Sequence, residues 1–169
     1  SRLANLLDED PRRIKLAYSI MFTLIGTPII YYGDEVAKVN DLDYYNQMYE
    51  MTGYKDSRYL GRGHMDWDLV NSQLKNPTSL ASQIYQAIKE MTTLRAKHPS
   101  FARGSLEFTH VLNNDGTINQ HILAYVRTYK NDKMLVLQNL SSKAQQFDGR
   151  SVGIDVNTLD AYEFHWIES

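Results

Sequence analysis

The sequence predicts an α+β fold, with helices in the first part of the chain and antiparallel β-structure in the last third. Three patterns support this prediction. Apolar residues recur at helical spacing over residues 11–25 and 80–97. Between these helices, residues 28–32 form a continuous apolar run, which is typical of a strand buried on both faces. From about residue 104 onward, apolar and polar residues alternate as they do in half-buried strands.

The two predicted helices have signals at their ends. Pro11 suits the first helical position, Asp10 can cap it, and Gly26 ends the run. Four apolar residues then recur on one face: Ile14, Tyr18, Met21 and Ile25. The second helix carries an apolar stripe of Ile84, Ile88 and Met91. It ends at His98-Pro99, because the residue before a proline is disfavoured in helical conformation.

A long segment, residues 36–78, separates the apolar run from the second helix. It is rich in Asn, Asp, Tyr and Gly and has no sustained period, so we expect a long loop. Loops of this length inside a compact domain are usually functional or disordered, and the aromatic content argues against disorder. The chain has 12 tyrosines, which fit a sugar-stacking surface and fit β-sheet packing equally well.

The last part of the chain, residues 103–169, is predicted to be an antiparallel β domain. Alternation begins near Leu106, and Asn114-Asp115-Gly116 is a hairpin signal. The final strand alternates through Tyr162, Phe164 and Trp166. We therefore expect the chain to divide near Ala102, into residues 1–102 and 103–169.

Composition and charge exclude several classes of function. The chain has 169 residues, 18 basic and 20 acidic side chains and no cysteine. There is no basic excess to bind nucleic acid, and the longest apolar stretch is too short and too interrupted for a membrane span. The five histidines are scattered, so we expect no metal and no cofactor. The absence of cysteine favours a cytoplasmic location over secretion. The N-terminus, Ser-Arg-Leu-Ala-Asn, suggests that the chain is cut from a longer protein.

Two polar clusters are candidates for a site. Asp34 and Glu35 directly follow the predicted strand, where the chemistry of an α/β barrel is found. Adjacent residues point different ways, whereas a retaining glycosidase needs two carboxyls about 5 Å apart, so we expect them to shape the loop. The second cluster is Asp56-Ser57-Arg58, which offers either a clamp for a polar ligand or a local salt bridge. The residues alone leave these alternatives open.

Four segments carry a resemblance to a known family. GTPIIYYGDE, at residues 26–35, resembles the eighth-strand segment of the α-amylase superfamily. GDEVAKVND, DSRYLGRG and NPTSLASQIYQAIKEMTTLRAKHPSF follow in an order that is similar to amylosucrase. The resemblance covers about residues 10 to 169. Tyr59, Gly61 and Gly63 depart from it, since amylosucrase has Trp, His and Pro there.

The resemblance implies the last strand and last two helices of a (β/α)8 barrel, followed by an antiparallel β C-terminal domain. A full barrel takes about 250 residues, so the upstream barrel would be the missing partner. The family's catalytic carboxylates belong to earlier strands, which implies no catalytic residue in this chain. Arg58 matches the arginine at the base of the glucose pocket, and Asp56 is a weaker substrate-binding candidate.

The implied parent is a retaining enzyme that transfers glucose from sucrose or an α-glucan to an acceptor or to water. Two alternatives stay open: an α-glucosidase or α-amylase hydrolase, and a non-catalytic carbohydrate-binding or structural module. A strand suited to burial on both faces favours the enzyme fragment over the module. Without the other barrel strands, we also expect the chain to self-associate through its apolar surface.

Overall fold

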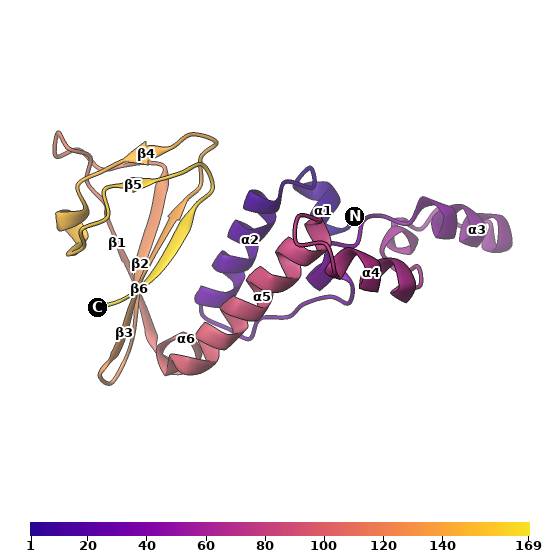
Figure 1. Ribbon diagram of the computed structural model, residues 1–169, viewed down its shortest axis with the longest axis horizontal. Coiled ribbons are helices and arrows are strands. Elements are labelled where there is room, and N and C mark those ends of the chain that lie inside the picture. The colour runs from indigo at the N-terminus through magenta and orange to yellow at the C-terminus, as the bar shows by residue number, and fades with distance from the viewer. The chain divides into compact units, whose positions relative to one another are not determined.

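The computed structural model describes residues 1–169 and forms two compact units. The first unit comprises residues 1–14 and 29–89, and the second comprises residues 15–28 and 90–169. Helices are followed along the chain by an antiparallel sheet, which confirms the predicted fold class (Figure 1). The expected division of the chain into residues 1–102 and 103–169 stays a prediction.

The two predicted helices are present. Helix α2 (Pro11–Thr23) begins after Asp10, whose carboxylate accepts a hydrogen bond from the backbone N–H of Arg12 at 2.9 Å. It ends two residues before the predicted limit, close to Gly26, which has φ +126°. Helix α5 (Leu80–Lys97) has the predicted bounds, and His98 separates it from helix α6 (Pro99–Arg103). None of the helices combines the length and hydropathy that a membrane span requires.

Residues 28–32 do not form the predicted strand. No other segment of the chain pairs with them, and the side chains of Ile29 and Tyr31 are 79% and 47% exposed. A strand is stable only when neighbouring strands satisfy its backbone N–H and C=O groups. The run has the composition of a buried strand, but no strand of the chain pairs with it.

The prediction of a long loop at residues 36–78 was also wrong. This segment contains helices α3 (Leu42–Thr52) and α4 (Trp67–Leu74). Two 3-10 turns, η1 (Asp34–Val36) and η2 (Ser57–Gly61), accompany them. An aspartate caps each helix: Asp41 accepts from the N–H of Tyr44, and Asp66 accepts from the N–H of Leu69, both at 2.9 Å. Helix α3 buries no residue, so no apolar period marks it in the sequence.

The second unit is built on a four-stranded antiparallel sheet with the order β1-β2-β3-β6. Its strands are β1 (Ser105–Thr109), β2 (Ile122–Tyr129), β3 (Asp132–Asn139) and β6 (Phe164–Glu168). A short pair, β4 (Gln145–Gln146) with β5 (Thr158–Leu159), forms a separate two-stranded sheet (Figure 1). The predicted turn at Asn114-Asp115-Gly116 lies between β1 and β2, and Gly116 has φ +84° there.

Both faces of the central strands are covered. One face packs into an apolar cluster with Leu135, Leu137, Phe147 and Leu159. The other face packs Tyr125 and Val136 against Phe101 of α6 and against Leu24, which follows α2. Strand β3 is therefore buried on both sides, although the sheet is antiparallel. A short α1 (Leu3–Leu6) belongs to the first unit, where the polar cluster described next is found.

Candidate functional site

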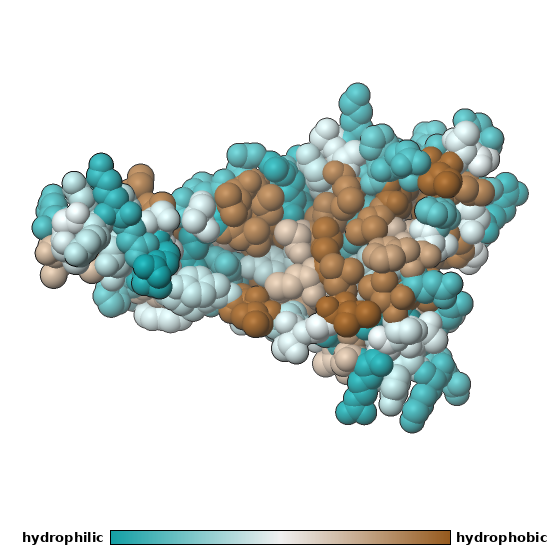
Figure 2. Space-filling view, turned by 180° about the vertical axis from the view of Figure 1, so that it is seen from behind, coloured by the Kyte–Doolittle hydropathy of each residue, from teal (hydrophilic) through white to brown (hydrophobic).

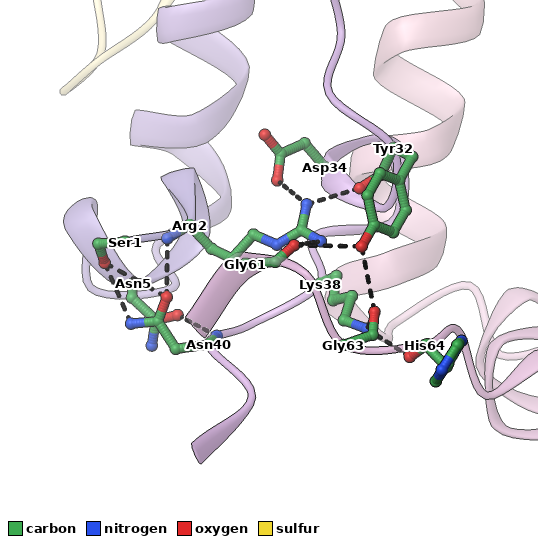
Figure 3. Close-up of polar contacts among 10 residues, drawn as sticks. All are labelled: Ser1, Arg2, Asn5, Tyr32, Asp34, Lys38, Asn40, Gly61, Gly63 and His64. Carbon is green, nitrogen blue, oxygen red and sulfur yellow. Dashed lines mark hydrogen bonds and ion pairs between the residues drawn. The ribbon is translucent and has the colours of Figure 1, made fainter. Parts of the chain in front are cut away.

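A polar cluster in the first unit is built around Arg2, whose side chain is only 2% exposed (Figure 3). Its Nη1 donates to the Asp34 carboxylate at 3.1 Å and to the Tyr32 carbonyl at 2.5 Å. Its Nη2 donates to the Gly61 carbonyl at 2.6 Å. The guanidinium carbon also lies 4.8 and 4.9 Å from the ring centroids of Tyr31 and Tyr32. Arg2 thus joins the end of the apolar run to the η2 turn.

Tyr32 and Lys38 hydrogen-bond to the same loop, at carbonyls that follow Gly61. The Tyr32 hydroxyl donates to the Gly63 carbonyl at 3.2 Å, and Lys38 Nζ donates to that carbonyl at 2.7 Å. Lys38 Nζ also donates to the His64 carbonyl at 2.5 Å (Figure 3). Burial, assisted by the charge of Arg2, lowers the pKa of Lys38. Arg2, Tyr32 and Lys38 are called the carbonyl clamp below, because all three hold carbonyls of residues 61–64.

Asp34 and Glu35 lie in the η1 turn beside this clamp. Burial raises the pKa of Asp34, and the hydrogen bond and charge of Arg2 offset only part of that rise. Glu35 Oε2 is buried and has no hydrogen-bond partner. The contact between Asp34 and Arg2 is one that shapes a loop, and we retain loop shaping as the proposed role of both carboxylates.

Asp56 and Arg58 form a local pair at the start of η2. Asp56 Oδ1 accepts from the N–H of Arg58 at 2.9 Å, and Arg58 Nη2 lies 2.6 Å from Asp56 Oδ2. Hydrogen bonds from the Arg58 side chain and backbone lower the pKa of Asp56 to about 2, so the carboxylate is ionised near neutral pH. The Arg58 side chain is 71% exposed, and no other acidic group of the chain pairs with it. Its substrate-binding role stays a proposal.

A groove of about 650 Å³ lies in the first unit, within the size range of small-molecule sites. Its lining includes the buried apolar residues Val36, Val70 and Ala81, with Met65 packed against them. The lining also contains four acidic residues, Glu9, Asp41, Asp43 and Asp66. Lys38 and His64 belong both to this lining and to the contacts of the carbonyl clamp. The sequence candidates Asp34, Glu35, Asp56 and Arg58 do not line the groove.

The local pair of Asp56 and Arg58 could be expected from the sequence, whereas Arg2, the central residue of the polar cluster, could not. Asp56 and Arg58 are two positions apart, so their contact could be expected from spacing. Arg2 is separated from Asp34 by 32 positions and from Gly61 by 59 positions. No periodicity or motif in a single sequence identifies a contact over such distances.

Comparisons with known proteins agree with the class of fold described above. The model of the "Alpha-amylase SusG C-terminal domain" matches residues 122–149, from β2 into the region after β4. The chain is 32% identical to the trehalose synthase of Thermus thermophilus, over 87% of this chain and 16% of that protein. It is 28% identical to the cyclomaltodextrinase of Geobacillus thermopakistaniensis (strain MAS1), over 86% of this chain and 20% of that protein.

Solved structures give the same fold. The maltogenic amylase from S. marinus superposes over 99% of this chain and 21% of its own, with a TM-score of 0.69 and 21% identity. The cyclic alpha-maltosyl-(1→6)-maltose hydrolase from Arthrobacter globiformis superposes over 99% of this chain and 32% of its own, with a TM-score of 0.67 and 21% identity. The chain therefore matches the C-terminal portion of α-amylase-family enzymes. These matches do not single out amylosucrase.

Proposed function

We propose that this chain is the C-terminal part of a retaining α-amylase-family enzyme that acts on an α-glucan or a related sugar. The observation that carries the proposal is the position of the carbonyl clamp. It joins the end of residues 28–32, a run suited to a barrel strand, to the loop that contains Arg58. In α/β barrels the residues that bind and convert substrate lie in such loops, at the C-terminal ends of the strands.

In the proposed enzyme, this chain contributes to substrate binding while the reacting carboxylates come from upstream. A retaining mechanism needs one carboxylate as nucleophile and a second group as acid and base. Arg58 would leave Asp56 for an upstream carboxylate and present its planar fork of donors to the glucose hydroxyls. The partners of the chain are then the sugar and the upstream barrel.

The finer activity that we propose is glucosyl transfer of the amylosucrase kind, with transfer to an acceptor sugar. The order of the GDEVAKVND and DSRYLGRG segments supports it. Hydrolysis of an α-glucan is the second candidate. Gly61 and Gly63 favour it, because they replace the His and Pro of the amylosucrase loop. The names of similar proteins include a trehalose synthase and a cyclic alpha-maltosyl-(1→6)-maltose hydrolase.

Full-length enzyme assays test the proposal. The complete gene product is incubated separately with sucrose, maltose and a cyclomaltodextrin, and the products are followed by NMR. Glucosyl transfer gives new α-linked sugars, hydrolysis gives reducing ends in the α configuration, and a binding module gives neither. The isolated 169-residue chain is expected to be inactive on all three sugars. Turnover by the isolated chain that is lost in Asp34→Asn or Glu35→Gln would contradict the proposal.

Arg58 variants test the binding role within the same enzyme. Arg58→Ala should lower kcat/KM by about a hundredfold or more, because a carboxylate would lose its only partner at the base of the pocket. Arg58→Lys keeps the charge and loses the fork, so it should also be impaired. Arg150→Ala is the matched control, since Arg150 forms an equally local pair with Asp148 in the second unit. Wild-type kcat/KM in Arg58→Ala would favour the loop-shaping alternative.

A further inference from the structure

We propose that Arg2 is a positioning residue for the loop that carries Arg58, an inference that rests on the proposed function. The geometry points to it because one buried side chain reaches both segments involved. Its Nη1 binds the segment after residues 28–32, at the Tyr32 carbonyl and at Asp34. Its Nη2 binds the carbonyl of Gly61, the last residue of η2. Figure 3 shows the guanidinium between these partners.

The contacts require an arginine. A guanidinium is planar and presents several donors at fixed angles, so it can bind acceptors on two segments at once. A lysine ammonium at this position is a compact charge that could not span both segments. The guanidinium also lies within 5 Å of the ring centroids of Tyr31 and Tyr32, which favours a flat cation. Because Arg2 is only 2% exposed, water competes little for these bonds.

The clamp acts on Arg58 through the backbone of η2. Gly61 ends this five-residue turn, and Arg58 is its second residue. The carbonyl of Leu60 accepts from the N–H of Asp41 at 2.8 Å, which holds the turn at a second point. The Arg58 side chain is mostly exposed and its one charged partner is Asp56, within the same turn. The place at which the guanidinium is presented is therefore set by the backbone that Arg2 holds.

The first test uses this chain and follows amide hydrogen exchange in Arg2→Lys and Arg2→Met. We expect the amides of residues 57–64 to exchange about tenfold faster or more in Arg2→Lys, with the amides of α5 unchanged. Arg12→Lys is the matched control, since Arg12 is exposed and pairs locally with Asp10. If Arg2→Met also loosens α5, the unit has unfolded, and Arg2→Lys decides. Exchange within about twofold of wild type in Arg2→Lys would overturn the proposal.

The second test uses the full-length enzyme and asks whether Arg2 acts through Arg58. Arg2→Lys should lower kcat/KM by about tenfold or more at an unchanged melting temperature. Added to Arg58→Ala, it should cause little further loss, because the residue that it positions is already gone. If the loss of kcat/KM in the double variant equals the product of the two single losses, the positioning role is overturned. Wild-type kcat/KM in Arg58→Ala would remove the proposed binding role of Arg58 and the positioning role of Arg2 with it, whereas the sugar assays test the proposed function separately. Unchanged amide exchange of residues 57–64 in Arg2→Lys would exclude the positioning role of Arg2 and leave the proposed function untouched.

Discussion

Arg127 lies in the second unit with 1% of its surface exposed, and it forms no ion pair with a carboxylate. Its guanidinium donates to four backbone carbonyls, those of Thr23, Phe101, Gly104 and Ser105. Thr23 ends α2, and Phe101 and Gly104 lie at the end of α6. The last carbonyls of a helix have no intrahelical partner and carry partial negative charge. Two helix ends therefore provide the negative charge that a carboxylate would usually supply.

Replacement of Arg127 should strongly destabilise the second unit. Arg127→Met fills similar space but leaves these carbonyls buried without donors, so the free energy of unfolding should fall by about 3 kcal/mol or more. Urea unfolding followed by circular dichroism measures the change. Arg150→Met is the control, because the Arg150 side chain is 86% exposed, and its unfolding curve should stay close to that of wild type. A similarly small effect at Arg127 would contradict this account.

Asp132 should make stability depend on pH in the acidic range. Its carboxylate binds His98 Nδ1 at 2.8 Å and the N–H of Ser100 at 2.7 Å. Burial raises the pKa of Asp132, but these hydrogen bonds outweigh burial and hold it below the ordinary value. A lowered folded pKa stabilises the fold above the unfolded-state pKa of about 3.9, and this stability is lost as pH falls through the folded value.

The variant Asp132→Asn measures this contribution. It should unfold at lower urea concentration than wild type at pH 5, and the difference should shrink as pH falls below about 4. The exposed Asp155→Asn serves as the control and should follow wild type throughout. A difference between Asp132→Asn and wild type that stays constant from pH 5 to about 2.5 would show that the carboxylate charge contributes nothing.

Among the elements, those that bury a stripe of side chains could be predicted from the sequence. Helix α5 has the predicted bounds because Ile84, Ile88 and Met91 are buried at helical spacing. Helix α3 was missed because it buries no residue and depends on the Asp41 cap. Residues 28–32 were predicted as a strand because their composition favours one, yet a strand also needs partners that composition cannot supply.

The same distinction holds for the candidate site. The Asp56–Arg58 pair is local, and a spacing of two residues allowed it to be expected as one of two alternatives. The carbonyl clamp joins Arg2, Tyr32 and Lys38 to a loop more than 20 residues further along the chain. Only the folded chain brings such residues together. The sequence therefore indicated where the polar groups lie, but not which of them hold the loop.

Gly63 couples this loop to helix α3, which gives a prediction at the scale of the element. A Cβ on Gly63 would lie 1.9 Å from Asp41 Oδ2, so Gly63→Ala must displace the carboxylate that caps α3. Loss of such a cap costs about 1 kcal/mol. We expect amides of the first turn of α3 to exchange several-fold faster, measured by hydrogen exchange.

Gly61→Ala is the matched control for this substitution. A Cβ there would meet its nearest atom at 3.7 Å, and the backbone of Gly61 is not in the left-handed region. Exchange in α3 should therefore stay at the wild-type rate. Wild-type exchange in Gly63→Ala as well would show that Asp41 can move without loss of its cap, and that Gly63 is not required for the loop.

At the scale of the whole molecule, the chain exposes many large apolar side chains. Several of them lie at or near the run that follows α2: Ile25 is 69% exposed, Ile29 79%, Tyr31 47% and Tyr32 42%. Figure 2 shows hydrophobic residues at the surface of the chain among polar ones. Large exposed apolar patches usually mark surfaces that bind a partner. In the proposed enzyme, the upstream barrel strands cover residues 28–32.

The isolated chain should therefore self-associate through this run, because no barrel strand covers it. Complete burial of one isoleucine contributes about 1.5–3 kcal/mol, so Ile29→Lys should weaken association by about tenfold or more. Sedimentation velocity over a range of concentrations gives the dissociation constant, and binding of a hydrophobic dye reports the exposed surface. Ile118→Lys is the control, because Ile118 is 43% exposed and lies in the turn between β1 and β2. A wild-type chain that sediments as a monomer with low dye binding would show that the exposed side chains of residues 28–32 do not drive association. The case for a missing barrel would then depend on sequence similarity alone.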